Sequence, residues 1–228
     1  MACTDRLDNG ASYAVIHAAL VDNGALSESE DLIIIDGSRQ KIYLIQNGNV
    51  SASYECSTGF KGFGNDFGSE KTSTGLMYIS RKIGSGEPVG RVFQYRVPTR
   101  YILPEDSGDY AWVCTRLLTL QGLQEENQNV YQRSIYIHGT NRRSRLGIAA
   151  SGGCIRMSNN GVINLFDRVG VGTKVFIAAT DPAENPPLPC GDPGPGIGRR
   201  VKDLAGQILR TPDPYSGRDE VGGEPEHD

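Results

Sequence analysis

The sequence contains no long hydrophobic run. No stretch approaches the roughly 18 consecutive apolar residues that a membrane-spanning helix requires. Positive charge is not in excess either, since 23 Lys and Arg stand against 27 Asp and Glu, giving a formal net charge of −4. Nucleic-acid-binding domains usually show a basic patch and a high isoelectric point. These absences exclude a transmembrane helix within the sequence and argue against a nucleic-acid partner.

Metal-ligand spacing is also missing. The 228 residues include 5 cysteines and 3 histidines, and none of them form a C-x-x-C, H-x-H or H-x-x-x-H pair. A structural zinc site usually shows two close ligand pairs. We therefore expect no metal site. Because the number of cysteines is odd, at least one thiol has no partner within the chain.

Glycine is abundant, with 29 residues, but the glycine-rich loops lack nucleotide-binding fingerprints. The two loops at 59–75 and 84–90 contain neither G-x-G-x-x-G nor the Gly-Lys pair of a phosphate-binding loop. They lead into predicted strands rather than helices. We interpret them as β-loops that are able to line a groove for an extended substrate.

The first 30 residues predict a helical extension without an export signal. The apolar run from Ala14 to Val21 favours a short amphipathic helix over 12–22. The residues before it include Asp5, Arg6 and Asp8 rather than the basic region of a signal peptide.

Most of the chain after residue 30 predicts β-strands. Asn47-Gly48 lies between two apolar runs and is the strongest short signal for a hairpin. One helix is predicted over 159–169, with Ser158 as its N-cap. The predicted strands are 32–36, 41–46, 50–58, 76–83, 92–97, 112–120, 134–138 and 174–179. This pattern indicates a mainly β fold, either a β-sandwich or a partly closed barrel, with one or two short helices.

The composition changes after Thr180. Nine of the 12 prolines fall in residues 181–228, which is typical of a wrapping or disordered tail. Within this tail, residues 197–210 have the apolar spacing of a short helix. The predicted organisation is an extension at 1–30, a folded domain at 31–180 and the tail at 181–228.

Residues 134–158 carry the side chains best suited to chemistry. Strand alternation places Tyr136 and His138 on one face, opposite the apolar residues beside them. The same alternation gives Cys154 and Arg156 a common face. If the apolar residues face the core, one groove holds an imidazole, a thiol and a guanidinium.

This combination favours nucleophilic catalysis. A free thiol is only a few per cent ionised at neutral pH, so an imidazole that removes its proton creates a better nucleophile. Gly152 and Gly153 allow the backbone before Cys154 to turn sharply, and its N–H groups then face a developing oxyanion. Arg156 is able to hold a carboxylate through two hydrogen bonds. The histidine and cysteine alone are weak evidence, because free cysteine is among the most buried residue types.

The complete string of motifs resembles a known family. H-G-T at 138–140, followed by S-x-G-C-I-R-M at 151–157, resembles the L,D-transpeptidase catalytic domain (YkuD-type) of bacterial peptidoglycan enzymes. DGSRQKIYLIQNG at 36–48 is similar to the opening hairpin of that domain, and S-T-G and K-T-S-T-G follow in the usual order. The resemblance covers residues 31–180 and implies the β fold of that family.

The resemblance implies roles for the motif residues. Cys154 matches the family's nucleophile and His138 its general base, while the carbonyl of Gly139 orients the imidazole. The oxyanion is expected to face the backbone N–H groups of Gly153 and Cys154. The residues expected to contact substrate are Tyr136, Ser151, Gly152 and Arg156.

The resemblance also implies a reaction. The usual substrate of the family is the tetrapeptide stem of peptidoglycan. The cysteine attacks the carbonyl at the L-centre of diaminopimelate, releases D-Ala and retains a thioester. An amine from a second stem, a D-amino acid or a lipoprotein then resolves the thioester. No cofactor is needed, and carbapenems are the expected inhibitors.

Two alternatives remain open. With water as acceptor, the same site is an L,D-carboxypeptidase, a hydrolase. The other alternative is a catalytically silent peptidoglycan-binding domain. Gly152 motivates it, because the family motif most often has histidine there, and Ser73 similarly replaces a common proline. A papain-like hydrolase is disfavoured, since those chains place cysteine before histidine.

The expected location follows from the substrate. An enzyme that acts on peptidoglycan is expected in the cell envelope, with a role in cell-wall organisation and cell shape. The cytoplasm is the alternative, because no export signal is recognised. The sequence indicates no oligomeric state.

Overall fold

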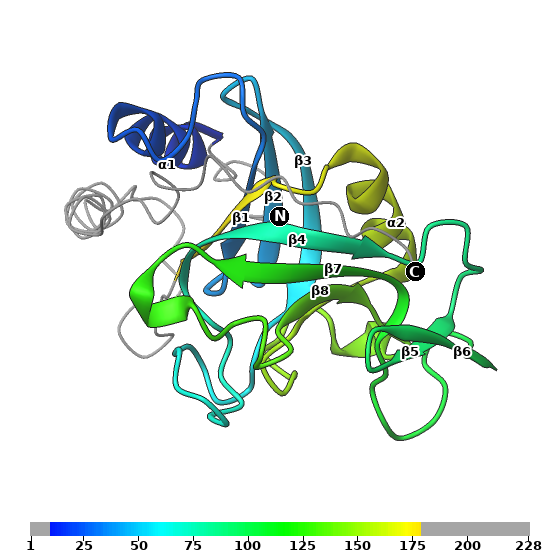
Figure 1. Ribbon diagram of the computed structural model, residues 1–228. Coiled ribbons are helices and arrows are strands. Elements are labelled where there is room, and N and C mark those ends of the chain that lie inside the picture. The colour runs from blue at the N-terminus through cyan, green and yellow to red at the C-terminus, as the bar shows by residue number, and fades with distance from the viewer. Residues whose placement is uncertain (1–9, 179–228) are drawn as a thin grey trace, which may run out of the picture.

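Strands are the main regular secondary structure in residues 10–178, the part of the chain that the computed structural model describes (Figure 1). The helices are α1 (Gly10–Asp22) and α2 (Asn159–Arg168), with single 3₁₀ turns at Glu125–Asn127 and Arg143–Arg145. The strands are β1 (Leu32–Asp36), β2 (Lys41–Gln46), β3 (Asn49–Ser57), β4 (Gly75–Ile83), β5 (Arg91–Gln94), β6 (Val97–Ile102), β7 (Cys114–Gly122), β8 (Tyr136–Gly139), β9 (Ile155–Met157) and β10 (Lys174–Ala178). The predicted mainly β class is confirmed. The predicted tail at 181–228 and its helix at 197–210 lie outside the described residues.

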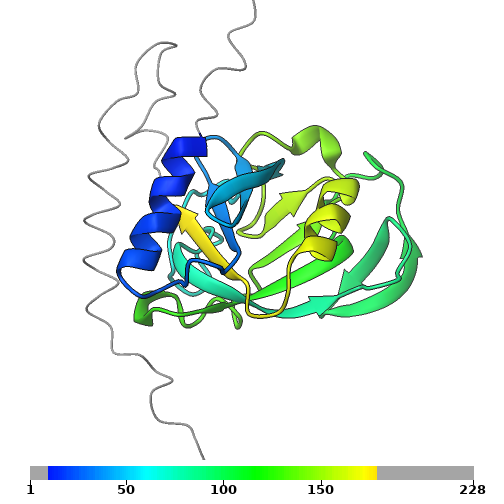
Figure 2. The same cartoon turned by 90° about the horizontal axis from the view of Figure 1, so that it is seen from above.

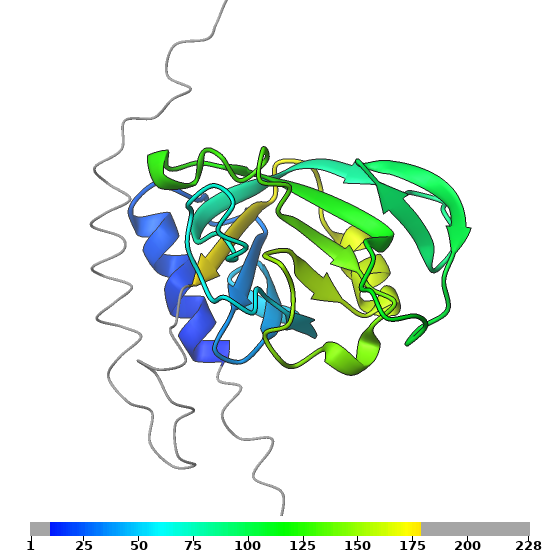
Figure 3. The ribbon, with the colours of Figure 1, turned by 90° about the horizontal axis from the view of Figure 1, so that it is seen from below.

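Eight of these strands close into a barrel. Their hydrogen-bonded order is β4-β10-β1-β2-β3-β9-β8-β7, and β7 pairs with β4 to complete the ring. The pairs β1–β10 and β8–β9 are parallel, whereas their neighbours are antiparallel. The β5–β6 hairpin extends from β7 and lies on the opposite side of the barrel from α1 (Figure 3). Of the two predicted architectures, the structure has the barrel.

Turn chemistry decides where the strands end. Asn47 and Gly48 adopt φ angles of 50° and 72°, and they join β2 to β3 in the predicted hairpin. The predicted single strand at 92–97 is wrong, because Tyr95 and Arg96 also have positive φ angles, of 51° and 68°. The chain therefore turns there and forms the β5–β6 hairpin. Positive φ is uncommon for such large side chains, so the local sequence carried no signal for this turn.

The barrel is filled by aliphatic side chains. Alternate residues of β1 and β2 point inward, and α2 contributes further apolar side chains to the same core. The residues concerned include Ile33, Ile35, Ile42, Leu44, Val162, Leu165 and Phe166. Ser158 caps α2, as predicted, by accepting a hydrogen bond from the Gly161 N–H at 3.0 Å.

Helix α1 lies against the outside of the barrel (Figure 2). Its residues Tyr13, Ile16 and Leu20 pack with the outward-facing Leu32 and Ile34 of β1 in a second apolar cluster. β1 is therefore buried on both faces, which explains its uninterrupted apolar run. No helix between residues 10 and 178 is long and apolar enough to cross a membrane.

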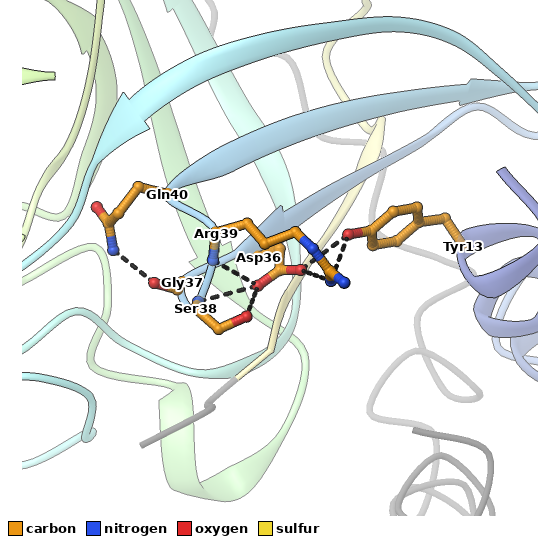
Figure 4. A network of polar contacts seen from close by, with 6 residues as sticks. All are labelled: Tyr13, Asp36, Gly37, Ser38, Arg39 and Gln40. Carbon is orange, nitrogen blue, oxygen red and sulfur yellow. Dashed lines mark hydrogen bonds and ion pairs between the residues drawn. The ribbon is translucent and has the colours of Figure 1, made fainter. Parts of the chain in front are cut away.

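A buried carboxylate fastens α1 to the barrel (Figure 4). The Tyr13 hydroxyl donates to Asp36 Oδ2 at 2.8 Å, and Arg39 Nη1 donates to the same oxygen at 2.9 Å. Ser38 donates to the other oxygen through its backbone N–H and its hydroxyl, at 2.9 and 2.6 Å. Burial would raise the pKa of Asp36, but these hydrogen bonds outweigh it and hold the pKa below its ordinary value.

Candidate active site

Parallel pairing of β8 with β9 brings the two halves of the motif together. Ile137 pairs with Ile155, and both side chains lie in the barrel core. His138 pairs with Arg156, so these two side chains share the opposite face. Cys154 lies two residues before Arg156, in the bend that precedes β9, and the Arg156 charge acts on both Cys154 and His138. The predicted apolar face is confirmed, because Ile137, Ile155 and Met157 lie in the core cluster, whereas the orientation of Cys154 stays a prediction.

His138 is buried and held in one tautomer. Its side chain has 3% relative exposure, and Nδ1 lies 2.7 Å from the carbonyl oxygen of Gly139. A carbonyl only accepts hydrogen bonds, so Nδ1 carries the proton and Nε2 has a free lone pair. Burial lowers the pKa of His138 from 6.5 to about 4, and the nearby Arg156 charge also lowers it, while the Gly139 contact opposes both effects. The imidazole is therefore neutral at neutral pH and able to accept a proton.

Cys154 is partly exposed, and its thiol is free. Its Sγ donates to the carbonyl oxygen of Ser134 at 3.2 Å. Burial raises the pKa of the thiol, while the Tyr136 N–H and the Arg156 charge offset part of that rise. The thiol is therefore protonated at neutral pH, and it needs a base before it can act as a nucleophile.

The other two cysteines that the structure describes are also free, but they are fully buried. Cys56 and Cys114 both have 0% exposure. Burial raises the pKa of Cys114 to about 11 and raises that of Cys56 further. Neither thiol has the exposure or the ionisation that nucleophilic chemistry requires.

The two glycines before Cys154 have different environments. Gly153 has a φ of 118°, and a Cβ atom there would lie 3.0 Å from the Lys71 carbonyl oxygen and 3.0 Å from Ile135 Cδ1. Gly152 is exposed, and a Cβ atom on it would have no neighbour within 4 Å. The backbone conformation therefore requires glycine at position 153 only, whereas position 152 has room for a side chain.

Ser151 is buried, and its hydroxyl hydrogen-bonds to the backbone of its own loop, residues 151–154. Its side chain has 1% exposure, and its Oγ accepts from the Gly153 N–H at 3.1 Å and donates to the Cys154 carbonyl at 2.5 Å. The hydroxyl therefore fixes the backbone on both sides of the peptide between Gly153 and Cys154.

Positive charge lies beside the thiol. Arg156 is half-buried, and its Nη1 donates to the carbonyl of Ala150 at 3.0 Å. Burial lowers the pKa of Arg156, and the neighbouring charges of Arg145 and Arg142 lower it further, while Cys154 raises it. Tyr136 has 8% exposure.

The glycine-rich loop at 59–75 lies against the loop at 151–154, which contains Cys154. The sequence did not predict this contact. Thr72 Oγ1 donates to the Gly153 carbonyl at 2.8 Å. Arg133 donates to the Lys71 carbonyl at 2.7 Å and so holds the same loop. The K-T-S-T-G motif marked this segment, but no local pattern shows that its threonine contacts a residue 81 positions away.

Comparison with known proteins identifies the family. The family model described as the L,D-transpeptidase catalytic domain, YkuD, matches residues 30–177. This chain belongs to that family. Within the described residues 10–178 of this L,D-transpeptidase family member, no three His, Cys, Asp or Glu side chains gather in a group that would hold a metal ion.

Relatives match a short part of this chain. YqjB of Bacillus subtilis, named as an L,D-transpeptidase, is 54% identical over 41 residues, which is 18% of this chain and 23% of that protein. ErfK/SrfK of Salmonella typhimurium, also named as an L,D-transpeptidase, is 47% identical over 49 residues, which is 21% of this chain and 16% of that protein. The matched segment therefore spans less than a quarter of either relative.

Solved structures of L,D-transpeptidases are distant in sequence. One from Mycobacterium smegmatis is 19% identical with a TM-score of 0.43, covering 66% of this chain and 59% of that chain. The catalytic domain of an Enterococcus faecium L,D-transpeptidase is 17% identical with a TM-score of 0.42, covering 66% of this chain and 98% of that chain.

Proposed function

We propose that this chain is a cysteine-dependent L,D-transpeptidase that acts on the tetrapeptide stems of peptidoglycan. The observation that carries the proposal is the neutral imidazole of His138, held by the Gly139 carbonyl and paired across β8 and β9 with Arg156, whose charge also acts on the partly exposed thiol of Cys154. Membership of the family adds the substrate class.

The first step forms a thioester. Cys154 gives its proton to Nε2 of His138, after the thiol has exchanged its Ser134 partner for the imidazole by rotation about its Cα–Cβ bond. The thiolate attacks the carbonyl at the L-centre of diaminopimelate. The proton held by His138 then passes to the departing amine of D-Ala, which leaves the acyl group on sulfur.

The oxyanion of this step faces the N–H of Cys154. Both Gly153 and Cys154 were expected to donate, but the Gly153 N–H already donates to Ser151 Oγ. We therefore assign the oxyanion to the Cys154 N–H. Ser151 acts through the loop that it holds and not by direct contact with substrate.

The second step transfers the acyl group. An amine of a second stem, a D-amino acid or a lipoprotein gives its proton to His138 and attacks the thioester. The C–S bond then breaks, and His138 passes the proton to the departing sulfur, which regenerates the thiol and the neutral imidazole. Arg156 binds a substrate carboxylate, because its charge is half-buried and lies beside the nucleophile. Tyr136 and the open space at Gly152 border the donor peptide.

The catalytic unit is residues 31–180, with 1–30 as an extension and 181–228 as a tail. The reaction needs no cofactor. The site of action is the cell envelope, where cross-linked peptidoglycan is found.

Incubation with tetrapeptide muropeptides, followed by mass spectrometry, tests the proposal. The intact chain should release D-Ala and form dimers linked between two diaminopimelate residues. Cys154→Ala should abolish both products, whereas Cys114→Ala, which removes a buried thiol, should retain them. Dimers formed by Cys154→Ala would refute the assignment of the nucleophile.

Other products identify the alternatives. Tripeptide without dimers indicates an L,D-carboxypeptidase. The absence of any product, together with the absence of a carbapenem adduct on the intact protein, indicates a binding domain without catalysis.

A further inference from the structure

Thr72 lies outside the motifs that supply the nucleophile and the base, yet it contacts the backbone beside the nucleophile. Its side chain has 0% exposure. Its Oγ1 lies 2.8 Å from the carbonyl oxygen of Gly153 and 2.7 Å from the backbone nitrogen of Gly59. We propose that Thr72 is a positioning residue that orients the N–H of Cys154 toward the oxyanion. This inference rests on the function proposed above.

The direction of the hydroxyl proton is forced. A threonine hydroxyl has one hydrogen and two lone pairs. The Gly59 N–H is a donor, so Oγ1 must accept from it. The single hydroxyl hydrogen is then directed to the Gly153 carbonyl, which is only an acceptor.

That contact fixes the orientation of a whole peptide unit. The Gly153 carbonyl and the Cys154 N–H belong to the same planar trans peptide and point in opposite directions. Holding the carbonyl oxygen toward Thr72 therefore points the Cys154 N–H away from Thr72. Gly153 needs such a restraint, because glycine rotates more freely than any other residue. Ser151 holds the groups on either side of this peptide, and Thr72 holds the peptide itself.

Thr72 is itself rigidly placed. Its backbone N–H donates to the Gly62 carbonyl at 3.0 Å, and its carbonyl accepts from the Gly64 N–H at 3.0 Å. Arg133 holds the preceding residue through the Lys71 carbonyl. Because every polar group of Thr72 is paired, its hydroxyl is a fixed reference for the peptide of the nucleophile.

Variants of Thr72 test the inference through two reactions of the same thiol. Acylation by a tetrapeptide donor develops an oxyanion, whereas alkylation of Cys154 by iodoacetamide displaces iodide and develops none. Thr72→Val keeps the shape but removes the hydroxyl, and it should slow acylation by about 10–100-fold through kcat more than through KM. Its alkylation rate should be unchanged. Thr72→Ser restores the hydroxyl and should restore acylation.

The control is the same substitution two positions along the chain. The Thr74 hydroxyl accepts one long hydrogen bond, at 3.4 Å from Asn65, and Thr74→Val should leave both rates unchanged. Thr72→Ala provides a second variant without a hydroxyl if Thr72→Val does not fold. The acylation rate and the alkylation rate are both divided by the concentration of folded protein, which circular dichroism measures.

The outcomes separate this inference from the proposed function. If the wild-type chain is acylated and folded Thr72→Val or Thr72→Ala is acylated equally fast, the role of Thr72 is overturned and the proposed function is not. An equal loss of acylation and alkylation would also overturn it, since the defect would then lie in the thiol or the fold. Failure of the wild-type chain to acylate at all would refute the proposed function instead.

Discussion

Gly152 and Gly153 form a natural matched pair for testing backbone strain beside the nucleophile. Gly153→Ala places a side chain at a φ of 118°, in a region where a residue other than glycine costs about 1–3 kcal/mol. The new methyl group also lies 3.0 Å from the backbone carbonyl of Lys71, and overpacking of this kind adds about 1–3 kcal/mol. We expect the free energy of unfolding to fall by about 2–6 kcal/mol in total.

Gly152→Ala is the control, because it adds the same methyl group one residue away. Gly152 has no positive φ, and its Cβ position has no neighbour within 4 Å. Its free energy of unfolding should stay within about 1 kcal/mol of wild type, with any gain arising from reduced freedom of the unfolded chain. Urea unfolding followed by circular dichroism measures both variants. Equal unfolding midpoints and equal slopes for the two variants would refute the strain argument.

Two further predictions concern buried polar groups. The pKa of His138 is about 4 in the folded chain against an ordinary value of 6.5, so the unfolded chain binds the extra proton between these values. The free energy of unfolding should therefore decrease as pH falls through this window, by about 3 kcal/mol in total. His138→Gln should lose this contribution, and an unchanged difference between variant and wild type from pH 7 to 4 would contradict it. Tyr13→Phe removes a buried hydrogen bond to the Asp36 carboxylate and should cost about 1.5–3 kcal/mol in thermal or urea unfolding. Tyr95→Phe, at an 89% exposed position, should be neutral, and equal stability of the two variants would contradict the role given to the carboxylate.

Local signals predicted much of the fold. The Asn47-Gly48 turn, the Ser158 cap and the alternation along β8 depend on neighbours in sequence, and each is found where it was expected. The turn at Tyr95 and Arg96 was missed because neither residue favours a positive φ. That conformation is held by contacts distant in sequence, such as the hydrogen bond from Arg96 Nη2 to the Tyr131 carbonyl at 2.8 Å.

Within the site, the sequence predicted which side chains share a face but not how they are held. It expected a donated hydrogen bond to an oxyanion from Gly153, whereas the structure gives that N–H to Ser151. It also assigned no role to Thr72, whose partner lies 81 residues away. Such pairings depend on three-dimensional contact between loops, which strand periodicity does not encode.

The sequence by itself determined the family and the β class and predicted the reactive residues, because motif order and alternation are properties of the chain. The barrel closure by β4 and β7, the proton position on His138, the lowered pKa of His138 and the raised pKa of Cys154 were decided only by the tertiary structure. The physical reason is burial. Desolvation and fixed hydrogen-bond partners set the charge of a group, and both arise only when distant segments pack together.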